Sequence, residues 1–248
     1  MSLEGDSNLG HPALRLEQPT VRPNAASHAD HLSAWVRSPA KRVFDFVLVL
    51  AMLPLWLPLF LIVASLVRVT SRGPAIFLQK RVGRNGTLFT IYKFRTMKLS
   101  NEKRGLITTS DDQTITKVGR FLRCWKLDEL PQFLNVLRGE MSLVGPRPKV
   151  PEQQTGLLRC RPGITGAATI AFAQEEILLA AIPQGQLEEY FREVLLPLKN
   201  SLDDSYMAKA TPLADLVLLL RTAVRRWNRS EICDLHTNTA LPVVRSVQ

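Results

Sequence analysis

Two adjacent carboxylates, Asp128 and Glu129, are the residues of this sequence best suited to do chemistry. They stand at the expected start of a helix and directly follow Arg120, Arg123 and Lys126. Positive neighbours and a helix N-terminus both favour ionised carboxylates. An ionised pair suits a hard, oxygen-seeking cation such as Mg²⁺, and a carboxylate can also attack phosphorus to give an acyl phosphate. From these residues alone, ordinary helix capping is the alternative interpretation.

Basic residues around this pair are candidates to hold phosphate. Arg147 stands between two prolines that restrict its backbone, and a guanidinium suits phosphate geometry. Arg123, five residues before Asp128, is a second candidate. Arg161 lies in an Arg-Pro-Gly turn and either contacts phosphate or serves the turn alone. Lys126 either pairs with Asp128, contacts phosphate or points to solvent.

Other catalytic templates do not fit the sequence. It contains no CxxC, HExxH or Walker phosphate loop, and its four histidines lie near the two termini. Catalysis based on histidine is therefore not expected. Carboxylates with basic neighbours remain as the reactive groups.

The overall charge points to anionic partners. The 248 residues carry a net charge of +10, while the apolar share of 46% is that of an ordered chain. Such a surface attracts nucleic acid, phosphorylated substrates or an anionic membrane. Because the basic residues flank an apolar segment and no recognition helix or aromatic platform is evident, nucleic-acid binding is not expected.

That apolar segment is a membrane candidate. Residues 43–67 form a run whose only charge is Asp45, and about 20 apolar residues suffice to cross a bilayer. Pro54 and Pro58 predict a break or kink in the middle. Basic residues on both sides place both ends at the cytoplasmic face, so a re-entrant helix is favoured over a kinked span. Asp45 is expected to be a structural anchor, paired with the basic residues just before it.

The remaining pattern predicts short helices and one hairpin. Two β-prone runs flank an Asn-Gly pair, which is a strong hairpin signal. The last apolar stretch, 213–227, ends in a basic half and predicts either an interfacial helix or a core helix. The expected strands are 75–82 and 87–95, and the other expected helices are 116–122, 128–137 and 187–196.

A series of motifs in a fixed order resembles one family. After KRVFDF and the proline-containing apolar run, the sequence reads FLQKRVGRNGTLFTIYKFRTM, DDQTITKVGRFLR, LDELPQFLNVLRGEMSLVGPRP, RPGITG and LPLKNSLDDSYM. These motifs, spread over residues 41–226, resemble the monotopic phosphoglycosyl transferases. These are bacterial sugar transferases that start glycan assembly on a polyprenyl phosphate.

The resemblance implies a mainly helical catalytic domain with a small β-hairpin, held on the membrane by a re-entrant helix and interfacial amphipathic helices. It implies transfer of a sugar 1-phosphate from a nucleotide diphosphate sugar, usually a UDP-sugar, to undecaprenyl phosphate, with release of UMP. It also implies membrane lipid and a second copy of the chain as partners. The expected location is the inner membrane of a bacterium, with the catalytic domain on the cytoplasmic face and the product entering exopolysaccharide or related glycan synthesis.

Roles for single residues follow from the same resemblance. Asp128 would attack the sugar-linked phosphorus and carry the phosphosugar, while Mg²⁺ would bridge Asp128 and the diphosphate. Glu129 would support the metal site or manage a proton. Arg123, Lys126, Arg147 and Arg161 remain the candidates for binding substrate phosphates that the residues themselves suggest.

The expected organisation has four parts: a disordered cytoplasmic tail (1–36), the re-entrant segment with its basic flanks (37–72), the catalytic domain (73–230) and a C-terminal tail (231–248). One departure from the family is Lys126, where a small hydroxyl residue is usual before LDE. It keeps an alternative open, a catalytically silent relative that binds polyprenyl phosphate or scaffolds a glycan-assembly complex.

Overall fold

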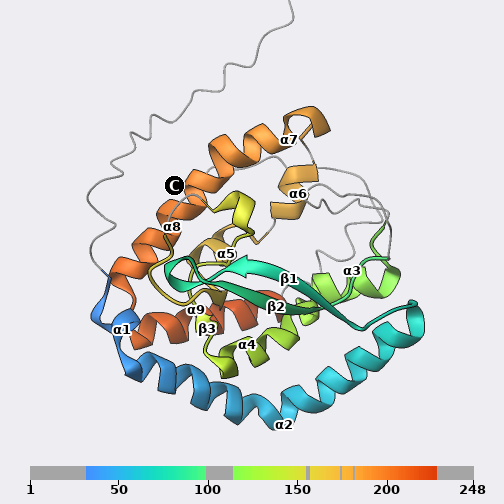
Figure 1. Ribbon diagram of the computed structural model, residues 1–248, viewed down its shortest axis with the longest axis horizontal. Coiled ribbons are helices and arrows are strands. Elements are labelled where there is room, and N and C mark those ends of the chain that lie inside the picture. The colour runs from blue at the N-terminus through green and yellow to red at the C-terminus, as the bar shows by residue number, and fades with distance from the viewer. Residues whose placement is uncertain (1–31, 99–113, 155–156, 174, 181, 228–248) are drawn as a thin grey trace, which may run out of the picture.

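The computed structural model describes residues 32–98, 114–154, 157–173, 175–180 and 182–227. Within these ranges the chain is mainly helical, with two pairs of short strands (Figure 1). The predicted combination of helices and a small hairpin is confirmed. In chain order the elements are α1 (Ala34–Arg37), α2 (Pro39–Thr70), β1 (Ile76–Val82), η1 (Arg84–Gly86), β2 (Leu88–Phe94), α3 (Lys117–Cys124), η2 (Leu127–Gln132), α4 (Phe133–Arg138), β3 (Ser142–Val144), η3 (Pro151–Gln153), β4 (Gly163–Thr165), α5 (Ala167–Ala171), α6 (Glu175–Ala180), α7 (Gln184–Tyr190), η4 (Phe191–Leu195), α8 (Leu196–Lys209) and α9 (Pro212–Trp227).

Helix α2 contains the whole apolar run and both prolines. It is continuous over 32 residues, so of the predicted break or kink only the kink is found. Figure 1 shows its axis changing direction near the middle, where Pro54 and Pro58 lie. A proline removes one backbone donor and crowds the preceding turn, and a bend relieves that crowding while the neighbouring hydrogen bonds persist.

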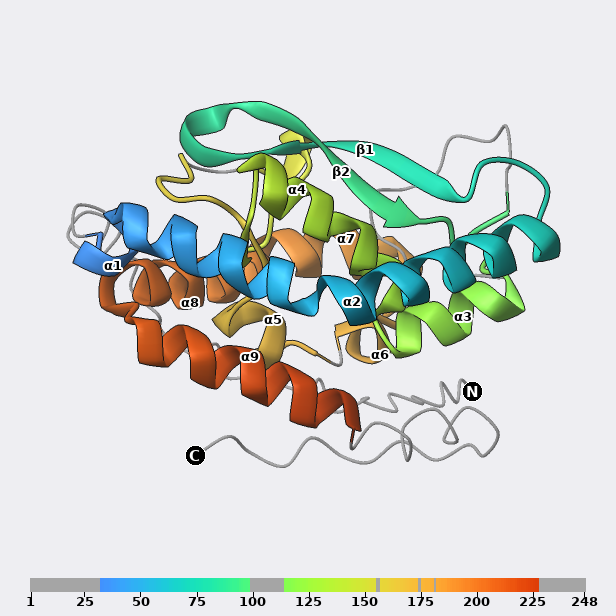
Figure 2. The ribbon, with the colours of Figure 1, turned by 90° about the horizontal axis from the view of Figure 1, so that it is seen from below.

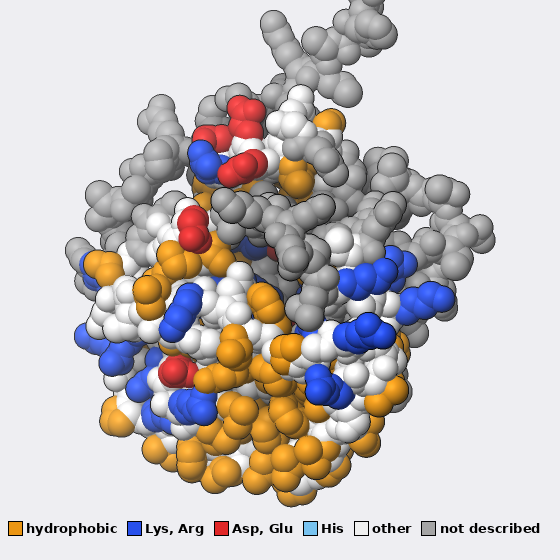
Figure 3. All heavy atoms as spheres, turned by 45° about the vertical axis from the view of Figure 1, so that its right-hand side comes forward, with side chains coloured by type: hydrophobic (Ala, Val, Ile, Leu, Met, Phe, Trp, Pro, Cys, Tyr) orange, Lys and Arg blue, Asp and Glu red, His pale blue; other side chains and the backbone are white. Residues whose placement is uncertain are grey.

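The outer surface of α2 is apolar and exposed. Figure 3 shows hydrophobic side chains gathered at the bottom of the molecule, where α2 lies in Figure 1, with Lys and Arg above them. Leu55 is 75% exposed, Ile62 64% and Val43 60%. By length and hydropathy α2 could cross a membrane. A continuous apolar surface of this size marks an interaction with a membrane or a protein.

The predicted hairpin is confirmed. Strands β1 and β2 pair antiparallel from Ile76 opposite Phe94 to Val82 opposite Leu88. The turn contains Asn85 and Gly86, both at positive φ (56° and 78°), a conformation that Asn and Gly tolerate best. Figure 2 shows the hairpin on one side of α2 and α9 on the other.

The second strand pair was not predicted. The sequence indicated only a turn at the Arg-Pro-Gly motif, but β4 begins there and pairs in parallel with β3. The two chains approach very closely, because a Cβ on Gly163 would lie 2.1 Å from the backbone nitrogen of Gly145. The glycines of the two motifs therefore serve backbone contact, which a motif alone does not show.

The other predicted helices form with shifted boundaries. Residues 187–196 belong to one long helical run, α7, η4 and α8 together. Of the expected N-terminal tail (1–36), only the last five residues are described, and α1 begins among them at Ala34. The expected C-terminal tail (231–248) lies outside the described residues.

A candidate active site beside the long apolar helix

The carboxylate pair lies in a tight turn between two helices. The predicted single helix over 128–137 is a 3₁₀ turn, η2, followed by α4. Pro131 explains the change, because it has no N–H to join an α-helical ladder. Lys126 precedes η2 with φ 53°, in the left-handed region that non-glycine residues rarely adopt. This sharp turn sets Asp128 and Glu129 at the interior side of the chain, where they are 8% and 4% exposed.

Glu129 is held by two cations. Its Oε1 accepts a hydrogen bond from Lys93 Nζ at 3.2 Å and another from Arg147 Nη2. Asp128 differs, because its Oδ1 is buried with no hydrogen-bond partner in the described part of the chain. One carboxylate is thus neutralised by the protein, and the other keeps an oxygen available for a ligand.

The pKa values of the two carboxylates are shifted in opposite directions. Burial, followed by the charge of Glu129, raises the pKa of Asp128 above its ordinary value, although nearby Lys93, Lys126 and Arg123 act against this. Burial also acts to raise the pKa of Glu129, but Arg147 and Lys93 lower it well below its ordinary value. The expectation that positive neighbours dominate both groups is therefore right for Glu129 and wrong for Asp128, because the sequence does not show burial.

Arg147 is anchored by Glu129 and is still partly exposed. It follows β3 through Gly145 and Pro146, so the tight contact with β4 determines where it emerges. Its side chain is 37% exposed while its guanidinium contacts Glu129. A guanidinium has five donors, so those not used by Glu129 remain for an oxyanion.

Two other predicted phosphate ligands also lie near the carboxylates. Arg123 Nε donates to Thr96 Oγ1 at 3.0 Å, which aligns the end of α3, and its charge acts on Asp128. The charge of Lys126 acts on both Asp128 and Glu129. The structure therefore brings Arg123, Lys126 and Arg147 to one cluster with the carboxylates.

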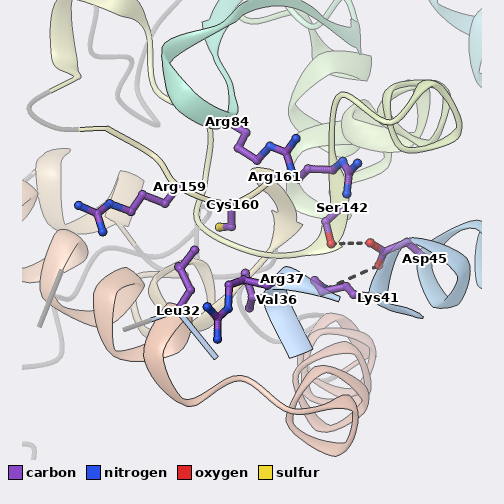
Figure 4. Close-up of a pocket in the computed structure, with 10 residues that line it drawn as sticks. All are labelled: Leu32, Val36, Arg37, Lys41, Asp45, Arg84, Ser142, Arg159, Cys160 and Arg161. Atoms are coloured by element: carbon purple, nitrogen blue, oxygen red, sulfur yellow. Dashed lines mark hydrogen bonds and ion pairs between the residues drawn. The ribbon is translucent and has the colours of Figure 1, made fainter. Parts of the chain in front are cut away.

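Arg161 is not part of that cluster. Its Nε donates to the carbonyl of Gly139 at 2.9 Å, just beyond the C-terminus of α4 and away from η2 at the other end. Figure 4 shows it beside Arg84 in a different cavity, together with Ser142 and Asp45. The alternative role for Arg161, support of local chain geometry, agrees with this contact.

Sequence reasoning missed three residues of the cluster. Lys93 contacts Glu129, and a small cavity is lined by Lys93, Arg81, Gln132 and Arg147. Gln132 is 2% exposed. A signal existed for Lys93, because strand alternation places it on the face of β2 that buries Phe89 and Ile91. Gln132 and Arg81 gave no comparable signal.

The apolar helix α2 contacts the segment formed by η2 and α4 at two places. Trp56, which is buried near the bend of α2, donates from Nε1 to the carbonyl of Leu130 at 2.9 Å. At the other end, Arg42 donates to the last carbonyls of α4, those of Val136 and Leu137. The position of the carboxylates is thus set directly by the helix that carries the apolar surface.

A buried ionic network fixes the start of α2. Asp45, predicted as an anchor, accepts from Ser142 Oγ at 2.7 Å and lies 3.8 Å from Lys41 Nζ. Lys41 also contacts Asp215 of α9 at 2.6 Å, and Asp215 accepts from Trp35 and Tyr206 as well. The predicted structural role of Asp45 is consistent with these contacts.

The site fits a Mg²⁺ ion through Asp128. Magnesium is commonly bound by one or two carboxylates together with substrate phosphates. The Oδ1 of Asp128, buried and without a hydrogen-bond partner among the described residues, offers such a ligand, whereas Glu129 is already paired with Lys93 and Arg147. Among the described residues no group of three or more His, Cys, Asp or Glu side chains gathers to hold a metal without substrate. A direct metal contact by Glu129 stays a prediction.

Comparison with known proteins agrees with the family that the motifs indicate. The profile described as bacterial sugar transferase matches residues 36–229, so the chain belongs to the bacterial sugar transferase family. The exopolysaccharide production protein ExoY of Sinorhizobium fredii is 32% identical over 206 residues, covering 74% of this chain and 83% of that protein.

Two longer relatives carry more specific names. The UDP-N-acetylgalactosamine-undecaprenyl-phosphate N-acetylgalactosaminephosphotransferase of Aeromonas hydrophila is 40% identical over 161 residues, 58% of this chain and 37% of that protein. The UDP-glucose:undecaprenyl-phosphate glucose-1-phosphate transferase of Escherichia coli K12 is 45% identical over 141 residues, 52% and 30% respectively. The chain thus spans only about a third of the length of these two relatives.

Proposed function

We propose that this protein transfers a sugar 1-phosphate from a UDP-sugar to undecaprenyl phosphate and releases UMP, as the first membrane step in making exopolysaccharide or a related glycan. The observation that carries the proposal concerns two adjacent buried carboxylates: Asp128 has an oxygen without a hydrogen-bond partner among the described residues, and Glu129 is neutralised by Lys93 and Arg147. Family membership and the names of the relatives support the same reaction.

In the first step, an oxygen of Asp128 forms a bond to the sugar-linked phosphorus. The bond from that phosphorus to the bridging oxygen breaks, and UMP leaves with the electron pair. In the second step, an oxygen of undecaprenyl phosphate attacks the same phosphorus, and the Asp128 carboxylate leaves. Both steps need charge neutralisation and alignment more than proton transfer.

The cations of the site supply that neutralisation. Arg147, which is partly exposed, binds phosphoryl oxygens, and Arg123 and Lys126 add positive charge near Asp128. Glu129 orients Arg147 and Lys93 through its two ion pairs. A Mg²⁺ ion held by Asp128 and the substrate would further neutralise the diphosphate.

Helices α2 and α9 would place the site at the cytoplasmic face of the inner membrane. The bent α2 is exposed and apolar along its outer surface, and α9 exposes Leu213, Leu220 and Val224 (69, 56 and 60%). With the bend of α2 inserted and both its ends at the surface, Trp56 would draw the catalytic turn to the lipid boundary. One site could then meet a soluble nucleotide and a lipid phosphate.

The test is UMP release by the purified full chain in nanodiscs, with undecaprenyl phosphate and a panel of UDP-sugars. We expect release that depends on the acceptor and on Mg²⁺ and that is lost in Asp128→Asn. The matched control is Asp204→Asn, the same change at an exposed position of α8, which should retain activity. Intact mass spectrometry after donor alone should show one added phosphosugar on the wild type and none on Asp128→Asn.

The departure at Lys126 leaves a second candidate, a silent relative that only binds polyprenyl phosphate. The lysine that stands in place of a small hydroxyl residue, two positions before Asp128, is the feature that motivates this candidate. Folded protein that binds undecaprenyl phosphate but releases no UMP with any donor would support it and contradict the transferase proposal. Normal turnover by Asp128→Asn would instead contradict only the assignment of the nucleophile.

A further inference from the structure

A second basic cavity lies apart from the carboxylate site. It measures about 130 Å³, several times the roughly 10–15 Å³ that one water molecule requires. It opens between α1, the first turns of α2, the hairpin turn and the segment before β4 (Figure 4). The charged side chains that line it are Arg37, Lys41, Asp45, Arg84, Arg159 and Arg161.

The positive charge of this cavity exceeds what its own acidic residue can balance. Asp45 is engaged by Lys41, Ser142 and the backbone of Leu143. In the part of the chain that the structure describes, Arg37, Arg84 and Arg161 make no ion pair with a carboxylate. Arg161 uses only Nε, toward the Gly139 carbonyl.

The arginines also lie close enough to repel one another. Figure 4 shows the guanidinium groups of Arg84 and Arg161 next to each other. Partial burial, followed by the charges of Arg84 and Arg42, lowers the pKa of Arg161 below its ordinary value. Like charges gathered at one cavity without a counter-ion are stabilised when an anion binds between them.

The position of the cavity suggests the source of the anion. Lys41 and Asp45 face the cavity from the inner side of α2, whereas Val43 and Val47 on the same turns are 60% and 54% exposed. The cavity therefore lies directly behind the point where the exposed apolar surface of α2 begins. If α2 enters a bilayer there, the cavity stands at the level of the phosphate groups of lipids.

We propose that this cavity is a second anion site, distinct from the carboxylate site, in which Arg84 and Arg161 bind a phosphate group and Arg37, which also lines the cavity, adds positive charge. Guanidinium groups bind phosphate in well-defined geometry through paired N–H donors. The anion site is argued only from the cavity and the charged side chains that line it. A lipid headgroup as the source of the phosphate rests on the membrane association proposed above, and a soluble phosphate compound is the other source.

The test measures thermal unfolding of the full chain in a detergent with an uncharged headgroup. The probes are short-chain phosphatidylglycerol, short-chain phosphatidylcholine and inorganic phosphate, each titrated at constant ionic strength. The variant Arg37→Gln/Arg84→Gln removes two exposed cations of the cavity. The variant Arg72→Gln/Lys80→Gln removes two exposed cations outside it, so both have the same net charge.

We expect at least one probe to bind the wild type and the variant Arg72→Gln/Lys80→Gln with similar affinity and to raise the unfolding temperature of both. The cavity variant should bind at least about tenfold more weakly, the loss of one charge-assisted hydrogen bond or more. A response confined to phosphatidylglycerol identifies a lipid headgroup, and a response to inorganic phosphate identifies a soluble compound. Equal weakening in both variants, or no response to any probe, would overturn the proposal.

This readout is independent of turnover. The same preparations are assayed for UMP release, so loss of the transferase proposal leaves the binding result unaffected. An active wild type whose unfolding temperature no probe changes would contradict the second site alone.

Discussion

Lys41 is the residue through which the apolar helix is tied to the C-terminal helix, and its removal should be costly. Its Nζ lies 2.6 Å from Asp215 Oδ2 and 3.8 Å from Asp45 Oδ1, and all three side chains are at most 8% exposed. The substitution Lys41→Met keeps the length of the side chain and removes its charge. Two buried carboxylates then lose their common cation.

The expected cost follows from this geometry. Breaking a buried ion pair by removing one partner costs about 3–5 kcal/mol. Asp215 retains hydrogen bonds from Trp35 and Tyr206, and Asp45 retains those from Ser142 and Leu143, so the lower end, about 3 kcal/mol, applies. For a chain of this size that lowers the unfolding temperature by about 6–12 °C.

A double-mutant cycle isolates the contact between Lys41 and Asp215. The variants are Lys41→Met, Asp215→Asn and the two together, followed by tryptophan fluorescence in one detergent at one heating rate. Because the double variant removes both charges of the closest pair, it should be less destabilised than the sum of the single variants by about 2 kcal/mol. The control, Lys80→Met on the exposed side of β1, should change stability by less than about 0.5 kcal/mol. Additive effects of the two single variants would refute the reasoning.

Three further predictions concern the site and its supports. Lys93→Met removes a cation 3.2 Å from Glu129, so the rate of UMP release should fall about tenfold or more. Because the pKa of Glu129 rises without this cation, the acidic limb of the pH–rate profile should move to higher pH. An unchanged pH–rate profile would contradict this prediction. Burial, the largest cause, raises the pKa of Asp203 to about 7, so stability that is present below about pH 4 is lost as the pH rises through 7. In unfolding experiments Asp203→Asn should abolish that loss and be more stable than the wild type by about 2–4 kcal/mol at pH 8. A wild-type stability that rises between pH 4 and pH 7 would contradict this prediction. Gly119→Ala would place Cβ 2.0 Å from the Thr96 carbonyl oxygen, so α3 must shift and the protein should lose about 1–3 kcal/mol of stability or more. The unfolding temperature should fall accordingly, and a thermal unfolding curve like that of the wild type would contradict this prediction.

The sequence predicted those features that depend on residues close together along the chain. The Asn-Gly turn predicted the hairpin, because few residues accept positive φ at both positions. The acidic pair of the LDELPQ motif and the Pro-Arg-Pro segment predicted Asp128, Glu129 and Arg147, and the structure brings these three together. The apolar run predicted a membrane segment that breaks or kinks at its prolines, and the structure shows one continuous helix that bends there.

Contacts between distant segments were decided only by the tertiary structure. Lys93 and Glu129 are 36 residues apart, and Trp56 and Leu130 are 74 apart, so no local pattern relates them. The parallel pairing of β3 with β4 also depends on two backbones meeting where a side chain would collide.

The pKa values of charged groups and their positions in space likewise depend on the tertiary structure. The sequence determined that Asp128 and Glu129 have basic neighbours, but not that burial raises the pKa of one while two ion pairs lower the pKa of the other. It also placed Arg161 among the phosphate ligands of the catalytic site, whereas folding puts Arg161 beside Arg84 at the other end of α4. Residue types and their order determine which chemistry is available. Burial and distance determine which groups carry it out, and both depend on how the whole chain packs.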